Sequence, residues 1–367
     1  MAVTLGAALA MPSTGVAGVA AIQDDRMTIA APIEELQDRL KEVRATKAKV
    51  ARFDILWSEV AKTKPRNPAN HRDPAYDWTR ADIVINGFAR SKITPIVSVY
   101  STPGWAVQGR NDFVETQYNP NAPRPREYAR FMYAVAKRYA GKARHFEIWN
   151  EPNLKGFFSL NGKSSLPHYK RLVKTSFPVI RRANKRAIVI AGVAGPRSST
   201  GGGNIGAKPW LLGLVRDRSV KFHAYSQHLY PSQGPRFRSR AYNKAFPTWN
   251  SIPFIFAQLN KKRRGMKLYI TEAGYTTAET PFRKGPAAVK TLGQQRLFLR
   301  QMFTLPTVRS PRVAAVVWFN LTDNINWPAG LIEESGKRKP AWAVFRKIAN
   351  RPIPRALRVE LNPRLRR

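Results

Sequence analysis

Two segments of the sequence place a glutamate directly after an apolar run. Glu151 stands in FEIWNEPN (146–153), and Glu272 stands in YITEAGY (269–275). Two carboxyl groups on either side of a glycosidic bond can cleave it, because one protonates the departing oxygen while the other attacks the sugar carbon or activates water. A single glutamate is more often an ordinary solvated residue. The pair therefore has chemical meaning only if the fold brings the two side chains together.

The elements that must position this pair are eight apolar, β-branched runs at fairly even spacing. They cover 15–22, 49–56, 93–100, 145–150, 187–194, 221–230, 267–271 and 312–320. Segments with apolar residues at helical spacing lie between them, among them 32–47, 125–141 and 291–303. No change of composition marks a second domain. The alternation predicts an α/β fold, a single-domain (β/α)8 TIM barrel with a parallel sheet.

In such a barrel the active site lies at the C-terminal ends of the strands. Glu151 follows the fourth predicted strand and Glu272 follows the seventh. These strands lie on opposite sides of the barrel, so the two side chains should face each other across its mouth. We expect their carboxyl groups to be about 5 to 5.5 Å apart, the spacing of enzymes that retain anomeric configuration.

The two segments closely resemble the signature of glycoside hydrolase clan A, whose members are retaining enzymes on a (β/α)8 barrel. The resemblance spans roughly residues 15–347, and STPGWA (101–106) and KRKPAWAVF (337–345) are similar to segments of families 39 and 5. It implies that Glu151 is the acid/base, Glu272 the nucleophile and Asn150 the donor to the sugar 2-hydroxyl. It thus implies hydrolysis of O-glycosidic bonds, with β the expected configuration, in oligo- or polysaccharides by double displacement.

Other positions match the same family pattern. Arg52 matches the arginine beside the nucleophile, and His228 with Tyr230 matches a His-x-Tyr motif whose tyrosine hydrogen-bonds the nucleophile. Both side chains of the motif share one strand face and should point to the barrel centre. Trp318 matches a strand-eight tryptophan that forms a sugar platform. The chain departs from many family 5 members after strand three, where Tyr100 precedes STPGW and no histidine occurs.

The resemblance also sets charge requirements for the pair. Glu272 must be ionised to attack, and Arg52 together with a hydrogen bond from Tyr230 would favour its charged form. Glu151 must keep its proton near working pH, which partial burial and a nearby negative charge promote. Glu147 shares parity with Glu151 about one layer deeper, and we interpret it as a buried partner for a cation such as Arg52.

Tryptophans supply the candidate sugar platforms, because a pyranose presents an apolar C–H face to an aromatic ring. The candidates are Trp105, Trp318 and Trp327. Core positions are predicted for Trp149, Trp210 and Trp342, whereas Trp57 is compatible with either environment.

The sequence contains no cysteine, which excludes disulfides, thiolate metal sites and thiol nucleophiles. His71, His145 and His168 show no metal-ligand spacing. His223 and His228 are five residues apart and should lie on opposite faces of one strand, so they are not expected to share a metal. We therefore expect neither a metal ion nor an organic cofactor.

Charge is the most unusual bulk property of the chain. Lys and Arg number 63 against 23 Asp and Glu, which gives a net charge of +40 over 367 residues. Such a charge attracts polyanions such as nucleic acid, anionic lipid or acidic polymer. We interpret it as a solvated surface with nonspecific polyanion contact. The alternative functions are a barrel that binds polysaccharide without cleaving it, or a polyanion-binding protein.

The ends of the chain differ from its middle. Residues 1–20 are uncharged and contain an apolar stretch, typical either of a secretory signal or of the start of the first strand. We expect a catalytic domain over 15–350 and a basic tail over 351–367. No later segment is apolar for long enough to span a bilayer. We expect a secreted monomer that acts on carbohydrate without membrane contact.

Overall fold

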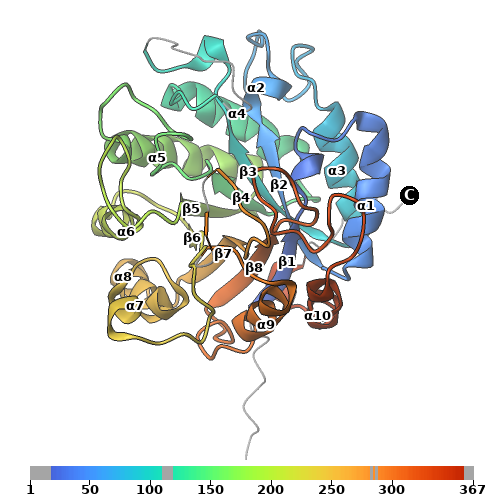
Figure 1. The fold of residues 1–367 in the computed structure, drawn as a ribbon. Helices are drawn as coiled ribbons and strands as arrows, with labels where there is room; N and C mark the ends of the chain where they lie inside the picture. The colour runs from blue at the N-terminus through green and yellow to red at the C-terminus, as the bar shows by residue number, and fades with distance from the viewer. Residues whose placement is uncertain (1–17, 110–118, 282–283, 286–287, 359–367) are drawn as a thin grey trace, which may run out of the picture.

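The computed structural model describes residues 18–109, 119–281, 284–285 and 288–358, and it shows a closed barrel of parallel strands in chain order (Figure 1). The strands are β1 (Val19–Gln23), β2 (Val50–Leu56), β3 (Thr94–Tyr100), β4 (His145–Ile148), β5 (Ile188–Ala194), β6 (Ala224–Gln227), β7 (Lys267–Ala273) and β8 (Val313–Phe319). Pairing of β1 with β8 closes the barrel. The predicted (β/α)8 fold is confirmed.

Helices surround the barrel (Figure 1). The α-helices are α1 (Leu36–Ala45), α2 (Trp57–Val60), α3 (Thr79–Arg90), α4 (Pro125–Arg138), α5 (Ser165–Ala183), α6 (Ala207–Arg216), α7 (Arg240–Lys244), α8 (Ile252–Lys262), α9 (Leu292–Met302) and α10 (Pro340–Ala349). Short 3₁₀ segments are η1 (Asp25–Met27), η2 (Ile33–Glu35), η3 (Gly104–Ala106), η4 (Trp249–Ser251) and η5 (Arg355–Leu357).

Local sequence explains where individual helices begin and which face they bury. α9 starts at a capping box in which Thr291 and Gln294 satisfy each other's backbone N–H groups. α4 has Pro125 in its first turn, where the missing N–H costs nothing. Apolar residues at helical spacing, such as Tyr128 and Phe131, then bury one side of α4 against the barrel.

The apolar residues form two separate cores. The larger one lies between the strands and the surrounding helices. The smaller one lies inside the barrel and includes Val50, Ile96 and Val317. Ile353 and Leu357, in and before η5, belong to this inner core and are buried. The first part of the predicted basic tail therefore packs against the barrel and closes the end opposite the mouth.

Strand boundaries differ from the prediction mainly at β6. The predicted strand 221–230 is wrong at both ends, since β6 covers only Ala224–Gln227. Residues 221–223 precede the strand, with Lys221 exposed. After Gln227 the chain bends toward β7, where the backbone N–H of Leu229 donates to the carbonyl of Glu272 at 2.9 Å. This bend carries the next side chains into the barrel mouth.

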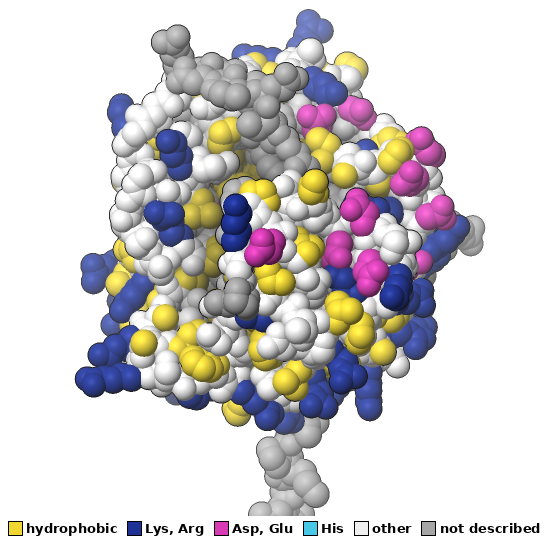
Figure 2. Space-filling view, in the orientation of Figure 1, with side chains coloured by type: hydrophobic (Ala, Val, Ile, Leu, Met, Phe, Trp, Pro, Cys, Tyr) yellow, Lys and Arg dark blue, Asp and Glu magenta, His cyan; other side chains and the backbone are white. Residues whose placement is uncertain are grey.

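Charge is unevenly distributed over the face seen in Figure 2. Lys and Arg lie around much of its margin, whereas the visible Asp and Glu gather on the side of α1. Asp38 and Glu42 lie on α1, and Glu334 lines the same pocket as Glu42. Salt bridges join this cluster to basic neighbours, as between Arg338 and Glu42 at 3.6 Å. Among the described residues, no helix is long and apolar enough to cross a membrane.

Candidate active site

An irregular backbone at the end of β4 delivers Glu151 to the barrel mouth. Trp149 and Glu151 both adopt left-handed backbone conformations, with φ of 70° and 44°, which are uncommon for residues with a side chain. Trp149 turns outward, where its indole is fully buried and donates to the carbonyl of Phe157 at 2.7 Å. The side chains of Asn150 and Glu151 are thereby left at the mouth.

A second irregularity positions Glu272 on β7. The pairing of β7 with β8 shifts in register between Ile270 and Ala273. Tyr269 faces the inner core, so strict alternation would turn Glu272 away from the barrel interior. The shift lets Glu272 point inward instead. Both glutamates are nearly buried, with exposed fractions of 7% for Glu151 and 8% for Glu272.

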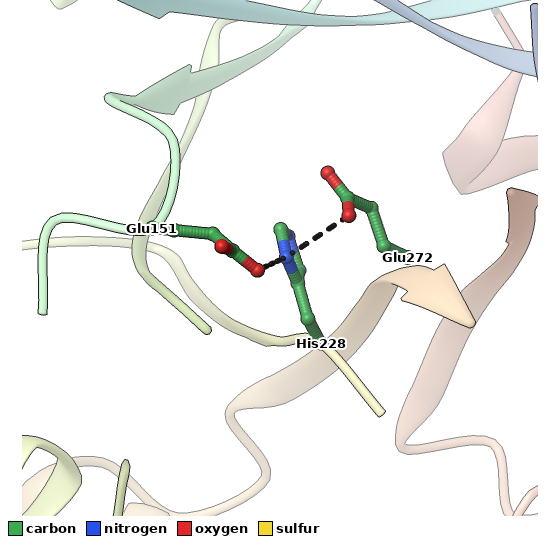
Figure 3. Close-up of side chains that lie close together, drawn as sticks. All are labelled: Glu151, His228 and Glu272. Atoms are coloured by element: carbon green, nitrogen blue, oxygen red, sulfur yellow. Dashed lines mark hydrogen bonds and ion pairs between the residues drawn. The ribbon is translucent and has the colours of Figure 1, made fainter. Parts of the chain in front are cut away.

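Figure 3 shows the two glutamates on either side of His228. His228 Nδ1 lies 2.7 Å from Oε1 of Glu151 and 3.4 Å from Oε2 of Glu272. One oxygen of each carboxylate and this nitrogen all lie within 4.8 Å of one another. Inverting glycosidases need roughly 6.5 to 9.5 Å between their carboxyl groups to admit water. The nearest oxygens of the two carboxylates lie closer together than this, which favours the shorter spacing of retaining enzymes.

Arg52 is the cation at the centre of the site. It is fully buried on β2 and donates through Nη1 to Oε1 of Glu272 and through Nε to Oε2 of Glu147, each at 2.8 Å. Its Nη2 donates to Oδ1 of Asn150 at 2.8 Å, and its Nη1 lies 3.2 Å from Oδ1 of Asp54. One guanidinium thus orients the nucleophile candidate, the asparagine and two deeper carboxylates together.

Tyr230 completes the surroundings of Glu272. Its hydroxyl donates to Oε2 of Glu272 at 2.9 Å, opposite the oxygen that Arg52 holds. The ring of Trp327 stands edge-on to Tyr230 with centroids 4.7 Å apart. Both Glu272 oxygens are therefore bound by donors, whereas Glu151 is hydrogen-bonded to His228 through Oε1.

Burial dominates the ionisation of the site. It raises the pKa of both Glu151 and Glu272 from 4.5 to about 7. A protonated His228 and the charge of Arg52 would both act against this shift at Glu272, and Arg52 acts against it at Glu151. Burial lowers the pKa of His228, so its imidazole is neutral at neutral pH. A proton can therefore be held on Glu151 near pH 7 while Glu272 is the better stabilised anion.

A sequence model of the cellulases of glycosyl hydrolase family 5 matches residues 18–302, a range that contains both glutamates. The chain belongs to glycosyl hydrolase family 5. The predicted resemblance to clan A is confirmed by this match. No curated protein sequence matches the chain significantly.

Solved structures with the same fold come from families 39 and 5. A family 39 glycoside hydrolase from Bacteroides cellulosilyticus WH2 has a TM-score of 0.66 and 16% identity, over 92% of this chain and 64% of that one. A monomeric β-xylosidase from Caulobacter crescentus CB15 has a TM-score of 0.62 and 18% identity, over 90% and 69%. An endo-β-1,4-glucanase from Xanthomonas axonopodis pv. citri has a TM-score of 0.55 and 13% identity, over 91% and 100%. These identities show the fold alone, and the chain spans less than two thirds of the first of these proteins.

Membership of family 5 makes the position after strand three informative. Tyr100 takes the place where many members carry a histidine. It is buried, and its hydroxyl donates to Oδ2 of Asp54 at 3.4 Å. Gln23 Nε2 donates to the same oxygen at 3.0 Å and its Oε1 accepts from Arg52 at 2.8 Å. This family 5 barrel thus has a Tyr100–Asp54–Gln23 chain that leads directly to Arg52.

The interpretation of Trp318 as a sugar platform is wrong. Its indole is fully buried among the outer core residues and donates to the carbonyl of Ala329 at 2.9 Å. Ala315 and Val317 face the inside of the barrel, so alternation turns Phe319 toward the mouth instead. Phe319 is only partly buried, and its ring lies 6.5 Å from that of Trp327. Phe319 is the strand-eight aromatic that faces the site.

The other tryptophans divide between the site and the core. Trp327 borders the site beside Tyr230, whereas Trp105 is partly buried with its indole donating to the carbonyl of Ala61 at 2.8 Å. Trp57 is fully buried and stacks on Phe131 at 5.1 Å, which places it in the core. Buried core positions are also found for Trp149, Trp210 and Trp342.

Sequence reasoning missed three residues of the site: Gln23, Asp54 and Phe319. Asp54 was the easiest to find, because it is two residues from Arg52 on the same face of β2. Gln23 could be found as the first polar residue after the apolar run of β1. Glu147, in contrast, is paired with Arg52 as expected. The site therefore extends one layer deeper than the family motif indicates.

The atoms that approach one another in Figure 3 could in principle hold a cation. Glu151, His228 and Glu272 form a group of ligand atoms within 4.8 Å. Two of these atoms, His228 Nδ1 and Glu151 Oε1, already form a hydrogen bond with each other, which explains their short distance without a cation. The expectation of a reaction without metal stays a prediction.

Proposed function

We propose that this family 5 barrel hydrolyses O-glycosidic bonds of β configuration in oligo- or polysaccharides, with retention of anomeric configuration. The observation that carries the proposal is the close opposition of two buried glutamates with different partners. Glu272 is bound by Arg52 and Tyr230, and Glu151 by His228. The β configuration is supported by the β-xylosidase and the endo-β-1,4-glucanase that share the fold.

In the first step, an oxygen of Glu272 attacks the anomeric carbon as the bond from that carbon to the leaving oxygen breaks. The proton of Glu151 passes to the leaving oxygen, and its pKa of about 7 lets it hold this proton near neutral pH. A glycosyl ester on Glu272 results. Asn150, held by Arg52 through its Oδ1, keeps its amide N–H₂ for a sugar hydroxyl.

In the second step, a water molecule enters where the leaving group stood. Glu151, now ionised, takes a proton from the water as its oxygen attacks the anomeric carbon, and the ester bond to Glu272 breaks. When His228 Nδ1 carries the ring proton, its hydrogen bond to Oε1 stabilises Glu151 as the carboxylate that this step requires. Two inversions at one carbon give net retention.

Proton NMR of the first-formed sugar tests this proposal. A panel of nitrophenyl β-glycosides and β-linked polysaccharides identifies a cleaved substrate, and the anomer released initially is then recorded. We expect the β anomer from a β substrate. Initial release of the α anomer would show an inverting mechanism and a wrong role for Glu272. Binding of polysaccharide without any cleavage would favour the non-catalytic alternative.

Two further properties belong to the proposal. A secreted location is supported by the uncharged, apolar residues 1–20, which lie largely outside the described residues. A monomer is supported by the monomeric β-xylosidase that shares the fold. Fractionation of the native host and light scattering of the purified chain test these two properties.

A further inference from the structure

Two neighbouring helices, α4 and α5, carry basic side chains in clear excess over acidic ones. α5 contains Lys170, Arg171, Lys174, Arg181 and Arg182 and no acidic residue. α4 contains Arg126, Arg130, Lys137 and Arg138, with Glu127 as its acidic residue. The catalytic proposal uses none of these side chains.

A groove of about 250 Å³ lies between the two helices. From α4 it is lined by Arg126, Arg130 and Tyr133, which follow one another at helical spacing. From α5 it is lined by Thr175, Val179 and Arg182 at the same kind of spacing. One helix face of each therefore contributes to the α4–α5 groove, and three guanidinium groups stand around a mostly apolar floor.

The arginines of the α4–α5 groove are largely free of internal partners. Among the described residues, neither Arg126 nor Arg182 has a carboxylate within ion-pair distance, and both are exposed. Arg182 lies over the ring of Tyr133 at 5.1 Å. Arg130 is the exception, since it lies 3.1 Å from the carboxylate of the half-buried Glu127. The Lys residues of α5 differ, since Lys170 and Lys174 lie 3.5 and 3.6 Å from Asp217.

We propose that the α4–α5 groove binds a linear polysaccharide that carries carboxylate groups. Guanidinium groups match carboxylates in planar, paired hydrogen bonds, and three of them in one groove suit a chain with repeated negative charge. The choice of a polysaccharide rests on the proposed glycosidase function.

Other polyanions fit the α4–α5 groove less well. Single-stranded nucleic acid binds where several aromatic faces are open for base stacking. Here the single aromatic is Tyr133, and Arg182 already lies over its ring. A membrane surface needs exposed large apolar side chains, whereas the apolar lining is Ala69, Ala129 and Val179.

The α4–α5 groove is separate from the catalytic site, since none of its lining residues belongs to that site. Thr175 connects the helices near the start of α4, where its hydroxyl donates to the carbonyl of Pro125 at 3.3 Å. A polymer held there keeps its other segments at high local concentration around the protein. The groove thus serves to retain substrate-bearing polymer without occupying the catalytic residues.

A binding titration with matched variants tests this proposal. The probe is a fluorescent oligogalacturonate of twelve residues, and a neutral cellodextrin is the reference. Arg126→Gln, Arg130→Gln and Arg182→Gln are combined in one variant of the full chain. The control combines Arg264→Gln, Arg296→Gln and Arg300→Gln, which removes the same charge from exposed positions near α8 and on α9.

We expect the groove variant to bind oligogalacturonate at least about 10-fold more weakly at 0.15 M salt, with a log–log salt slope smaller by about three. The control should change binding by less than about 2-fold. Equal weakening in both variants, or in neither, would overturn the proposal. Groove-dependent binding of a twelve-nucleotide single strand or of anionic vesicles in preference to oligogalacturonate would overturn the choice of partner.

Two controls separate this test from the catalytic proposal. Hydrolysis of a small neutral nitrophenyl glycoside should be equal in the groove variant and in the unaltered chain, which also shows that the variant is folded. Binding is measured without turnover, so it remains interpretable even if the chain cleaves none of the substrates offered.

Discussion

The two ends of the barrel interior are built from the same strands and have opposite chemistry. β2 contributes Val50 to the apolar inner core and Arg52 to the charged site two residues later. β7 similarly contributes Tyr269 to the inner core and Glu272 to the site. A distance of two or three residues therefore separates an apolar layer from one dominated by charged and hydrogen-bonded side chains.

The charged side chains at the polar end of the barrel are densely hydrogen-bonded to one another for a physical reason. The apolar layer and the η5 segment below it remove water from one side, so the buried charges must satisfy one another. Arg52 alone serves Glu147, Glu272 and Asp54. Such a network holds the glutamates in place, but it leaves stability sensitive to the loss of its one central cation. The apolar end supports the fold by packing alone.

The largest effect should come from neutralising the nucleophile. Glu272→Gln removes the attacking charge and keeps the side-chain shape, so kcat should fall by about 10⁴-fold or more while the protein remains folded. Initial rates on the best substrate measure this loss. Glu34→Gln, at an exposed position on the surface, is the matched control and should retain full activity. Substantial turnover by Glu272→Gln would assign the nucleophile elsewhere.

The second prediction concerns the central cation. Arg52→Met leaves Glu147, Asp54 and Glu272 buried without their common partner, which should lower the free energy of unfolding by about 3 to 5 kcal/mol. Urea unfolding followed by tryptophan fluorescence measures it. Arg44→Met, at an exposed position on α1, should cost less than about 0.5 kcal/mol. Equal free energies of unfolding for the two variants would show that Arg52 does not stabilise the buried carboxylates.

The third prediction addresses the apolar end. Ile353→Ala should lower the free energy of unfolding by about 2 kcal/mol, because it removes a buried side chain from the inner core. Ile325 is 83% exposed, so Ile325→Ala should change stability by less than about 0.5 kcal/mol. Below the unfolding transition, Ile353→Ala should keep its kcat. A large loss of kcat in the folded variant would mean that the two ends are coupled.

The smallest effect should appear in the pH dependence of Tyr230→Phe. The Tyr230 hydroxyl donates to charged Glu272, so it lowers a pKa that burial has raised to about 7. Removing the hydroxyl should raise this pKa by about half a unit to one unit. The acidic limb of the pH–rate profile should move to higher pH, with activity lost first on the acidic side. An unmoved limb would argue against this hydrogen bond in solution.

The sequence was sufficient for the barrel and for most of the charged end. Strands with helices between them identify the topology, and glutamates at the ends of strands four and seven identify the mouth. Alternation also pairs Glu147 with Arg52 correctly, because both lie in regular strands. These inferences use only the two-residue period of a strand and the common direction of parallel strands.

The assignment of Trp318 failed for a physical reason. VAAVVWF is apolar at every position of β8, so its pattern does not indicate which face points inward. The irregular backbone at Trp149 and the register shift after Ile270 have no signal of the same kind. Both change which way a side chain points without changing the polarity of the sequence. Family resemblance identified Glu151 and Glu272 as site residues. Strict alternation along β7 would instead have predicted that Glu272 points away from the barrel interior.

The pairing of β1 with β8 has a consequence for protein synthesis. Val19–Gln23 leaves the ribosome long before its partner residues Ala315–Phe319 are made, and Ile353 and Leu357 come later still. Until then β1 has one unpaired edge and the inner core is open to water. Contacts this distant in sequence form slowly. The barrel therefore cannot close before Ala315–Phe319 have been made, and its inner core is covered only when Ile353 and Leu357 follow.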